Sequence, residues 1–306
     1  MSKRPPAQRR SADFGLATVR RAAIGVVLGC AMAAVAGGAE PTVAETLLER
    51  GDYLVNGIAN CGNCHSPHHQ DGTLSGPALS GGDAIFGEGF TAYPPNITPD
   101  RGTGLGGWTE DQIVVALREG RTPSGASLRP PMPVPFYRAM SDRDAHAIAV
   151  YLRSLAPVEH TVPLSHYDQP PPRGGGLSVG VVSDPDRTNR VAYGAYLARI
   201  GHCMLCHTPR DTGGRPDIVH RNGAGGVVLR GRFGIVVAPN ITPDVTSGIG
   251  GWTDRQIKDA LTLGMRPDGT LLAPPMPWRY FATMRDQDLD AVVAYLRTLP
   301  PIPGTP

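Results

Sequence analysis

The sequence "NCGNCHSP" occupies residues 60–67, and "HCMLCHTP" occupies residues 202–209. Both contain Cys-x-x-Cys-His, and together they hold four of the five cysteines in the 306-residue chain. Because cysteine is otherwise almost absent, the recurrence of this motif predicts two copies of one site.

The rest of the chain also repeats. Three segments recur with a constant offset of 144 residues: "PPNITPDRGTGLGGWTEDQI" (94–113) and "APNITPDVTSGIGGWTDRQI" (238–257), "RPPMPVPFYRAM" (129–140) and "APPMPWRYFATM" (273–284), and "VYLRSL" (150–155) and "AYLRTL" (294–299). A long internal repeat indicates tandem copies of one unit. We therefore expect a first domain over residues 45–158 and a second over 187–302, joined by a Pro- and Gly-rich linker over 159–186.

Each copy is predicted to be helical, so the expected fold class is all-α with three or more short helices per domain. A capping box and a terminal glycine bound one helix in each copy, at Thr109, Gln112 and Gly120 and again at Thr253, Gln256 and Gly264. The high content of glycine and proline, 39 and 31 residues, indicates long loops and no large sheet.

The last helix of each copy shows apolar residues at i, i+3, i+4 and i+7, which predicts one buried face: Ile148, Tyr151, Leu152 and Leu155, then Val292, Tyr295, Leu296 and Leu299. A further helix precedes each cysteine motif and contains Gly51 or Gly194. Glycine is costly inside a helix, so we expect another helix to cross closely there. Three short helices bury little, and we expect a cofactor to complete each core.

A covalently attached haem is the cofactor that the cysteine motifs predict. Two thiols on one helical turn can add to the two vinyl groups of a haem, and the next residue, histidine, can bind its iron. The sequence thus predicts two haem c groups, attached through Cys61, Cys64 and His65 and through Cys203, Cys206 and His207.

Three other uses of such cysteines are weaker explanations. Disulfides give no reason for a histidine after both second cysteines. Zinc needs more ligands than one motif supplies and leaves the repeated methionine loops unexplained. A redox dithiol would suit one such motif alone, whereas the chain has two.

Two pairs of methionines recur and could supply the second axial ligand of each iron. Met132 and Met276 lie among prolines that restrict the backbone, so each thioether can be held rigidly. Met140 and Met284 come just before a helix, where an apolar residue usually packs against the first turn. We therefore predict that Met132 and Met276 bind iron, with core packing as the alternative for all four.

These elements, in this order, resemble the cytochrome c subunit of periplasm-facing alcohol, gluconate and aldehyde dehydrogenase complexes. The resemblance extends from about residue 47 to 301. It implies class I cytochrome c-like domains with His65 and Met132 on one iron and His207 and Met276 on the other. It also implies electron transfer, with no catalysis by this chain, from a dehydrogenase catalytic subunit to quinone, a soluble cytochrome or an oxidase. Many such subunits carry three haem domains, whereas this chain has two.

A diheme cytochrome c peroxidase is the alternative function. That class keeps one iron open to peroxide, which predicts that one copy lacks its methionine or has a catalytic acid or histidine nearby. Both copies here have the methionine. His68 and His69 follow the first motif alone and are expected in a solvated turn, although ligation of the first iron by a second histidine stays open. Trp108 and Trp252 are expected either to donate to haem or to pack beside it.

The N-terminus reads as an export signal over residues 1–36. Basic residues precede the apolar stretch 22–36, and Ala34-Val35-Ala36 is a suitable cleavage site for Sec-type export to the periplasm. Twin-arginine export, lipidation at Cys30 and an uncleaved anchor are the alternatives. Cleavage leaves 23 basic and 26 acidic residues, a net charge of −3. The net positive charge of the full chain therefore comes from the signal and gives no support for nucleic-acid binding. Peripheral membrane association stays open.

Overall fold

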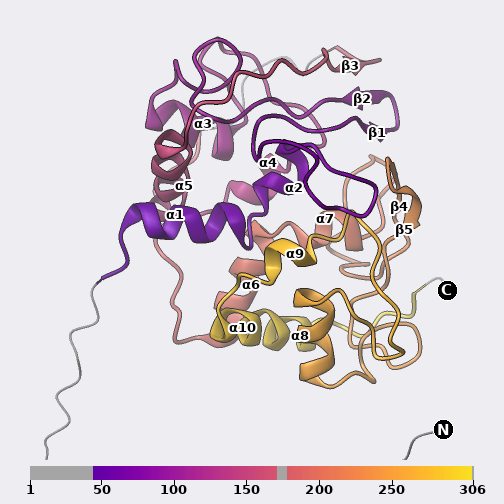
Figure 1. Ribbon diagram of the computed structural model, residues 1–306. Helices are drawn as coiled ribbons and strands as arrows, with labels where there is room; N and C mark the ends of the chain where they lie inside the picture. The colour runs from indigo at the N-terminus through magenta and orange to yellow at the C-terminus, as the bar shows by residue number, and fades with distance from the viewer. Residues whose placement is uncertain (1–43, 171–177, 305–306) are drawn as a thin grey trace, which may run out of the picture. The chain divides into compact units, whose positions relative to one another are not determined.

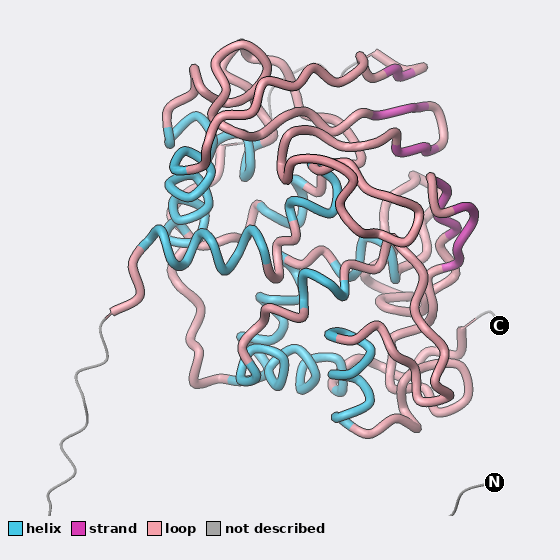
Figure 2. Tube along the Cα trace, in the orientation of Figure 1, coloured by secondary structure: helices cyan, strands magenta, loops and turns pink. Residues whose placement is uncertain are grey.

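The computed structural model describes residues 44–170 and 178–304 (Figures 1 and 2), and these residues form one compact unit. The expected signal peptide, its cleavage site and Cys30 lie outside the described residues. We call residues 45–158 the first copy and residues 187–302 the second copy; that each is a separate domain stays a prediction.

Each copy contributes five helices in the same order. The first copy has α1 (Leu47–Asn56), α2 (Cys61–His65), α3 (Glu110–Glu119), α4 (Val134–Tyr137) and α5 (Asp142–Ser154). The second copy has α6 (Arg190–Ile200), α7 (Cys203–His207), α8 (Asp254–Thr262), α9 (Trp278–Phe281) and α10 (Asp286–Arg297). The predicted helical character is confirmed, and Figure 2 shows that loops connect these short helices over much of the chain.

Local capping signals set several helix ends as predicted. In α3 and α8 the N-cap threonine and the third helical residue, glutamine, form reciprocal hydrogen bonds. Gly120 ends α3 in the left-handed conformation, at φ 67°. The second copy differs slightly, because α8 ends at Thr262 and Gly264 follows with φ 65°.

The predicted close crossings occur in both copies. α1 packs on α5 and α6 packs on α10, as Figure 1 shows. A Cβ added at Gly51 would lie 2.0 Å from the Ala147 carbonyl oxygen, and one added at Gly194 would lie 1.8 Å from that of Ala291. Only glycine allows the helix backbones to approach this closely.

The apolar faces of the last helices form much of the core. Ile148, Leu152, Val292 and Leu296 are buried as predicted, and the two tyrosines of the pattern are partly buried. Leu155 is partly buried and lies one residue beyond the end of α5, so the predicted helical face ends a turn early there.

A small antiparallel sheet corrects the all-α prediction. Its strand order is β3-β2-β1-β4-β5, with β1 (Ile85–Gly87), β2 (Phe90–Ala92), β3 (His166–Tyr167), β4 (Val228–Gly231) and β5 (Gly234–Val237). One hairpin comes from each copy, and they meet where Phe86 pairs with Arg230. Strands of two to four residues are too short to show an alternating pattern, so they could not be predicted from the sequence.

The segment predicted as a linker lies against the first copy on both sides of residues 171–177. β3 pairs with β2, and His160 Nδ1 bonds to the Ser80 carbonyl at 2.8 Å. After residue 177, the backbone N–H groups of Val179 and Val182 donate to the carboxylates of Glu119 and Asp142, both at 3.2 Å. The described parts of this segment are therefore ordered by contacts with the first copy.

Candidate haem-binding sites

Both cysteine motifs form the same short helix. α2 and α7 begin after residues with left-handed backbone, Asn60 at φ 40° and His202 at φ 43°. The carbonyl oxygen of His65 accepts from Gly81 N at 2.9 Å, and that of His207 accepts from Gly225 N at 2.8 Å. A loop with the same attachment therefore covers the end of each motif helix.

The histidine of each motif is oriented by a proline carbonyl. His65 Nδ1 lies 2.7 Å from the Pro95 oxygen, and His207 Nδ1 lies 2.8 Å from the Pro239 oxygen. A carbonyl oxygen only accepts hydrogen bonds, so Nδ1 must carry the proton and Nε2 keeps its lone pair. Burial also lowers the pKa of both histidines, which favours the neutral form. A neutral imidazole with a free Nε2 is the form that binds iron, so the donor set fits a haem.

The repeated Asn-Ile-Thr-Pro-Asp sequence holds these carbonyls in place. Asn96 Oδ1 accepts from the backbone N and the hydroxyl of Thr98 at 2.9 and 2.8 Å, and Asn240 does the same for Thr242 at 2.8 Å in both bonds. The orienting role of Pro95 and Pro239 was not predicted from the sequence. Pro95 and Pro239 occupy matching positions in the repeated segments 94–113 and 238–257, and that match was the available signal.

All four cysteines of the motifs are free thiols. Burial raises the pKa of Cys61 and Cys203 to about 12 and that of Cys64 and Cys206 to about 11. The thiols are therefore protonated near neutral pH and are present for attachment to haem. Among residues 44–170 and 178–304, no group of three or more His, Cys, Asp and Glu side chains is arranged to hold a metal ion.

The two methionine pairs differ in burial. Met140 is fully buried and Met284 is 7% exposed, and both belong to the apolar core. Met132 and Met276 are partly buried and lie in matching loops, where Met132 N donates to Arg129 O and Met276 N donates to Ala273 O. Iron ligation by Met132 and Met276 stays a prediction.

His68 does not lie in a solvated turn as expected. Its side chain is 6% exposed, its Nε2 lies 3.4 Å from the Tyr280 hydroxyl of the second copy, and its Nδ1 has no hydrogen-bond partner among the described residues. Contacts with the second copy cover it, which the sequence around His68 could not indicate. His69 is exposed, as expected. Trp108 and Trp252 are partly buried against the core, and their backbone carbonyls accept from Arg153 and Arg297.

The two candidate sites lie next to each other. Asn63, inside the first motif, donates its side-chain amide to the Pro275 carbonyl at 3.0 Å, one residue before Met276. A Cβ at Gly62 would lie 2.5 Å from the Tyr280 hydroxyl. The first motif helix therefore packs directly on the methionine loop of the second copy.

Comparison with known proteins agrees with these features. A family model described as cytochrome c matches residues 191–300. A diheme cytochrome c-type protein of Cereibacter sphaeroides is 31% identical, over 79% of this chain and 82% of the relative. The chain belongs to the cytochrome c family. The predicted family is therefore confirmed, and the family implies haem c as cofactor and electron transfer as the role.

Other relatives are named as subunits of dehydrogenases. The fructose dehydrogenase cytochrome subunit of Gluconobacter japonicus is 31% identical over 85% of this chain, and the gluconate 2-dehydrogenase cytochrome c subunit of Pantoea cypripedii is 29% identical over 83%. This cytochrome spans 55% and 60% of the length of those two relatives. Across residues 44–170 and 178–304, no helix has the length and apolar character needed to cross a membrane.

Proposed function

We propose that this chain binds two haem c groups and relays electrons between a dehydrogenase catalytic subunit and a respiratory acceptor. The observation that carries this proposal is the duplicated motif in which a proline carbonyl fixes the histidine Nδ1 and leaves Nε2 free. The dehydrogenase partner is suggested by the names of the relatives. Export to the periplasm is part of the proposal and rests on the N-terminal sequence.

Within each copy, the two cysteines would attach the haem and the histidine would bind its iron from one side. Met132 and Met276 would bind from the other side in the first and second copies. A haem iron held by histidine and methionine supplies one-electron chemistry at a raised reduction potential. Pro95 and Pro239 hold the imidazole rings in a single tautomer, so the ligand geometry can stay the same in both redox states.

The packing between the copies supports transfer from one site to the other. Asn63 bonds to the loop that presents Met276, and Tyr280 of the same copy contacts His68. These contacts keep the two sites adjacent while electrons enter at one and leave at the other. Electron entry would occur from the dehydrogenase, and exit would occur to quinone, a soluble cytochrome or an oxidase.

The proposal is tested by counting haems on the purified, exported protein. We expect two haems per chain that remain attached after denaturation and acid-acetone extraction. Cys206→Ser should weaken or abolish attachment in the second copy alone, because Cys61 and Cys64 stay intact. A count of one or none in the unmutated protein would reject the proposal.

A further inference from the structure

One charged side chain of the second copy, that of Arg232, contacts the first copy. The β4–β5 hairpin joins the sheet beside β1, where Arg230 pairs with Phe86 (Figure 1). Its turn carries Arg232, whose side chain is 22% exposed. Arg232 Nε donates to the His69 carbonyl at 3.1 Å, and its Nη1 lies 3.4 Å from Asp83 Oδ2. Both partners belong to the first copy.

These contacts lie next to the first haem-binding motif. Asp83 also accepts from the backbone N of His68, three residues after His65, at 2.9 Å. A Cβ at Gly82, the residue before Asp83, would lie 1.7 Å from the Cys64 carbonyl oxygen. Arg232, His68, His69, Asp83 and Phe86 line one open pocket at this junction. The guanidinium of Arg232 is therefore held in place beside the first site by two bonds.

The first copy has no basic residue of its own in this loop. Residues 66–95 contain three acidic residues and no lysine or arginine, whereas the equivalent residues 208–239 contain five arginines and two aspartates. The guanidinium of Arg232 lies close to the first motif, because its Nε donates to the carbonyl of His69, four residues after His65. Burial and the same guanidinium lower the pKa of His68. The fixed positive charge at this side of the first site thus comes from the second copy.

We propose that Arg232 raises the reduction potential of the haem in the first copy and that Asp83 opposes it. This inference rests on the proposed function. An oxidised haem iron carries one more positive charge than a reduced one, so a nearby cation destabilises the oxidised form more. A nearby carboxylate has the opposite effect. Arg232 would then contribute to a difference in potential between two sites whose ligand sets match.

The test is a redox titration of the full-length protein carrying both haems, with the midpoint of each haem followed by its absorbance. The midpoint that Met132→Ala lowers is assigned to the first copy. In Arg232→Gln that midpoint should fall, so the ratio of reduced to oxidised first haem at a fixed solution potential should drop several-fold. Asp83→Asn should raise the same midpoint, and Arg232→Lys should keep it near the unmutated value.

Arg221→Gln is the matched control, because it removes one arginine from the same loop at an exposed position. It should leave both midpoints unchanged, since solvent screens exposed charges. The double variant Arg232→Gln with Asp83→Asn should return the first midpoint toward the unmutated value.

The proposal is overturned if Arg232→Gln and Asp83→Asn retain two haems and leave the first midpoint unchanged, or if both shift it in the same direction. Equal shifts of both midpoints would also overturn it, because they would indicate a general structural change. Those results leave the proposed function standing. Lack of haem in the unmutated protein would instead reject the proposed function.

Discussion

The Tyr53 hydroxyl donates to Asp288 Oδ2 at 2.5 Å, and the Tyr196 hydroxyl donates to Asp144 Oδ2 at 2.6 Å. Each bond joins the first helix of one copy to the last helix of the other, so the two copies are linked reciprocally. Each hydroxyl also accepts from a backbone N–H at 3.2 Å, of Arg285 and of Ser141. The repeat in the sequence thus reappears as an approximate two-fold relationship between these contacts.

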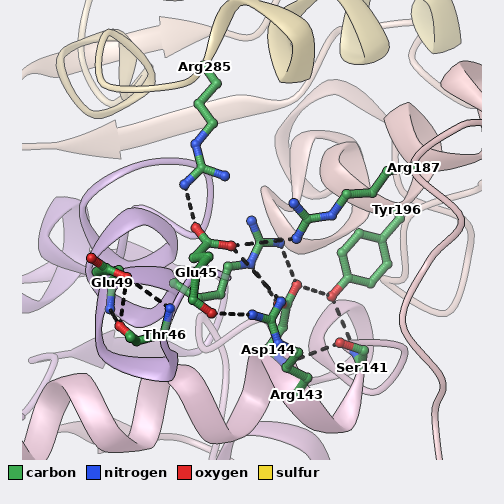
Figure 3. Close-up of polar contacts among 10 residues, drawn as sticks. Glu45, Thr46, Glu49, Ser141, Arg143, Asp144, Arg187, Tyr196 and Arg285 are labelled. Carbon is green, nitrogen blue, oxygen red and sulfur yellow. Dashed lines mark hydrogen bonds and ion pairs between the residues drawn. The ribbon is translucent and has the colours of Figure 1, made fainter. Parts of the chain in front are cut away.

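Glu45 adds a second link between the copies (Figure 3). Its carboxylate accepts from Arg285 of the second copy and lies 3.8 Å from Arg187 Nη2. Arg143 of the first copy donates to the backbone carbonyl of Glu45 at 2.8 Å. A partly exposed polar network around Glu45 therefore also links the copies, in addition to apolar contacts.

Tyr53→Phe and Tyr196→Phe should each destabilise the protein. Tyr53→Phe removes the donor to Asp288 Oδ2, whereas Tyr196→Phe removes one donor to Asp144, which keeps its bonds from Arg50. Each change also leaves a backbone N–H, of Arg285 or Ser141, without its acceptor, and an unsatisfied buried group costs about 1–3 kcal/mol. Urea unfolding monitored by circular dichroism measures the loss. Tyr167→Phe is the control, because its hydroxyl donates to the Pro130 carbonyl at an exposed site, and we expect a smaller change. If all three variants lose the same free energy of unfolding, the reciprocal bonds stabilise the interface no more than an exposed hydrogen bond does.

Gly51→Ala and Gly194→Ala should each disrupt one helix crossing. The new methyl groups would lie 2.0 and 1.8 Å from backbone oxygens, so the helices must move apart. We expect a loss of about 1–3 kcal/mol or more in each case, as for other overpacked cores. Gly107→Ala is the matched control, because nothing lies within 4 Å of its added Cβ. Unchanged thermal stability in both helix variants would contradict the crossings.

Met132→Ala and Met276→Ala should each remove about half of the near-infrared methionine-to-iron band. Each should also open one iron to carbon monoxide and lower its potential, since the methionine ligand raises it. Met140→Ala and Met284→Ala should leave the band intact and cost ~2–5 kcal/mol of stability, because those side chains are in the core. If the unmutated protein has a high-spin iron, binds carbon monoxide readily and reduces peroxide, the peroxidase alternative replaces electron transfer.

Stability at acid pH should depend on the buried pair of Arg50 and Asp144. Arg50 Nε and Nη2 each donate to the Asp144 carboxylate at 2.8 Å, and both side chains are at most 3% exposed. Burial alone would raise the pKa of Asp144, but the bonds and charge of Arg50, with the hydrogen bond from Tyr196 and the charge of Arg187, together outweigh it and lower this pKa. The folded pKa lies below the unfolded one, so the stabilisation is present above about pH 4 and is lost as pH falls through the folded pKa.

Asp144→Asn should therefore show a weaker dependence of the free energy of unfolding on pH below about pH 5 than the unmutated protein. It should also lose about 3–5 kcal/mol at neutral pH, because Arg50 is left buried without its charge partner. Denaturant titrations between about pH 3 and about pH 7 measure both effects. If the free energy of unfolding changes with pH equally in the two proteins, another group controls acid stability.

The residues of the candidate sites could be chosen from the sequence because their signals are local. The Cys-x-x-Cys-His spacing, the repeated proline-bracketed methionines and the family resemblance required no knowledge of distant contacts. The burial of His68 and the role of Pro95 could not be predicted in this way, because both depend on residues far away in the sequence. Their environments depend on Tyr280 and on the fold-back of the loop onto His65, which are separated from them in sequence by 212 and 30 residues.

The sequence by itself determined the two copies, the three longer helices of each copy, the capped ends of α3 and the glycine crossings. Caps and helical periodicity act within a few residues, and the repeat is visible when the two halves of the sequence are compared directly. Tertiary structure alone decided the five-stranded sheet, the reciprocal tyrosine bonds and the placement of Arg232 in the first copy. Those features join segments such as Tyr53 and Asp288, which lie 235 residues apart. Their formation depends on the packing of whole copies, which no local pattern of residue types encodes.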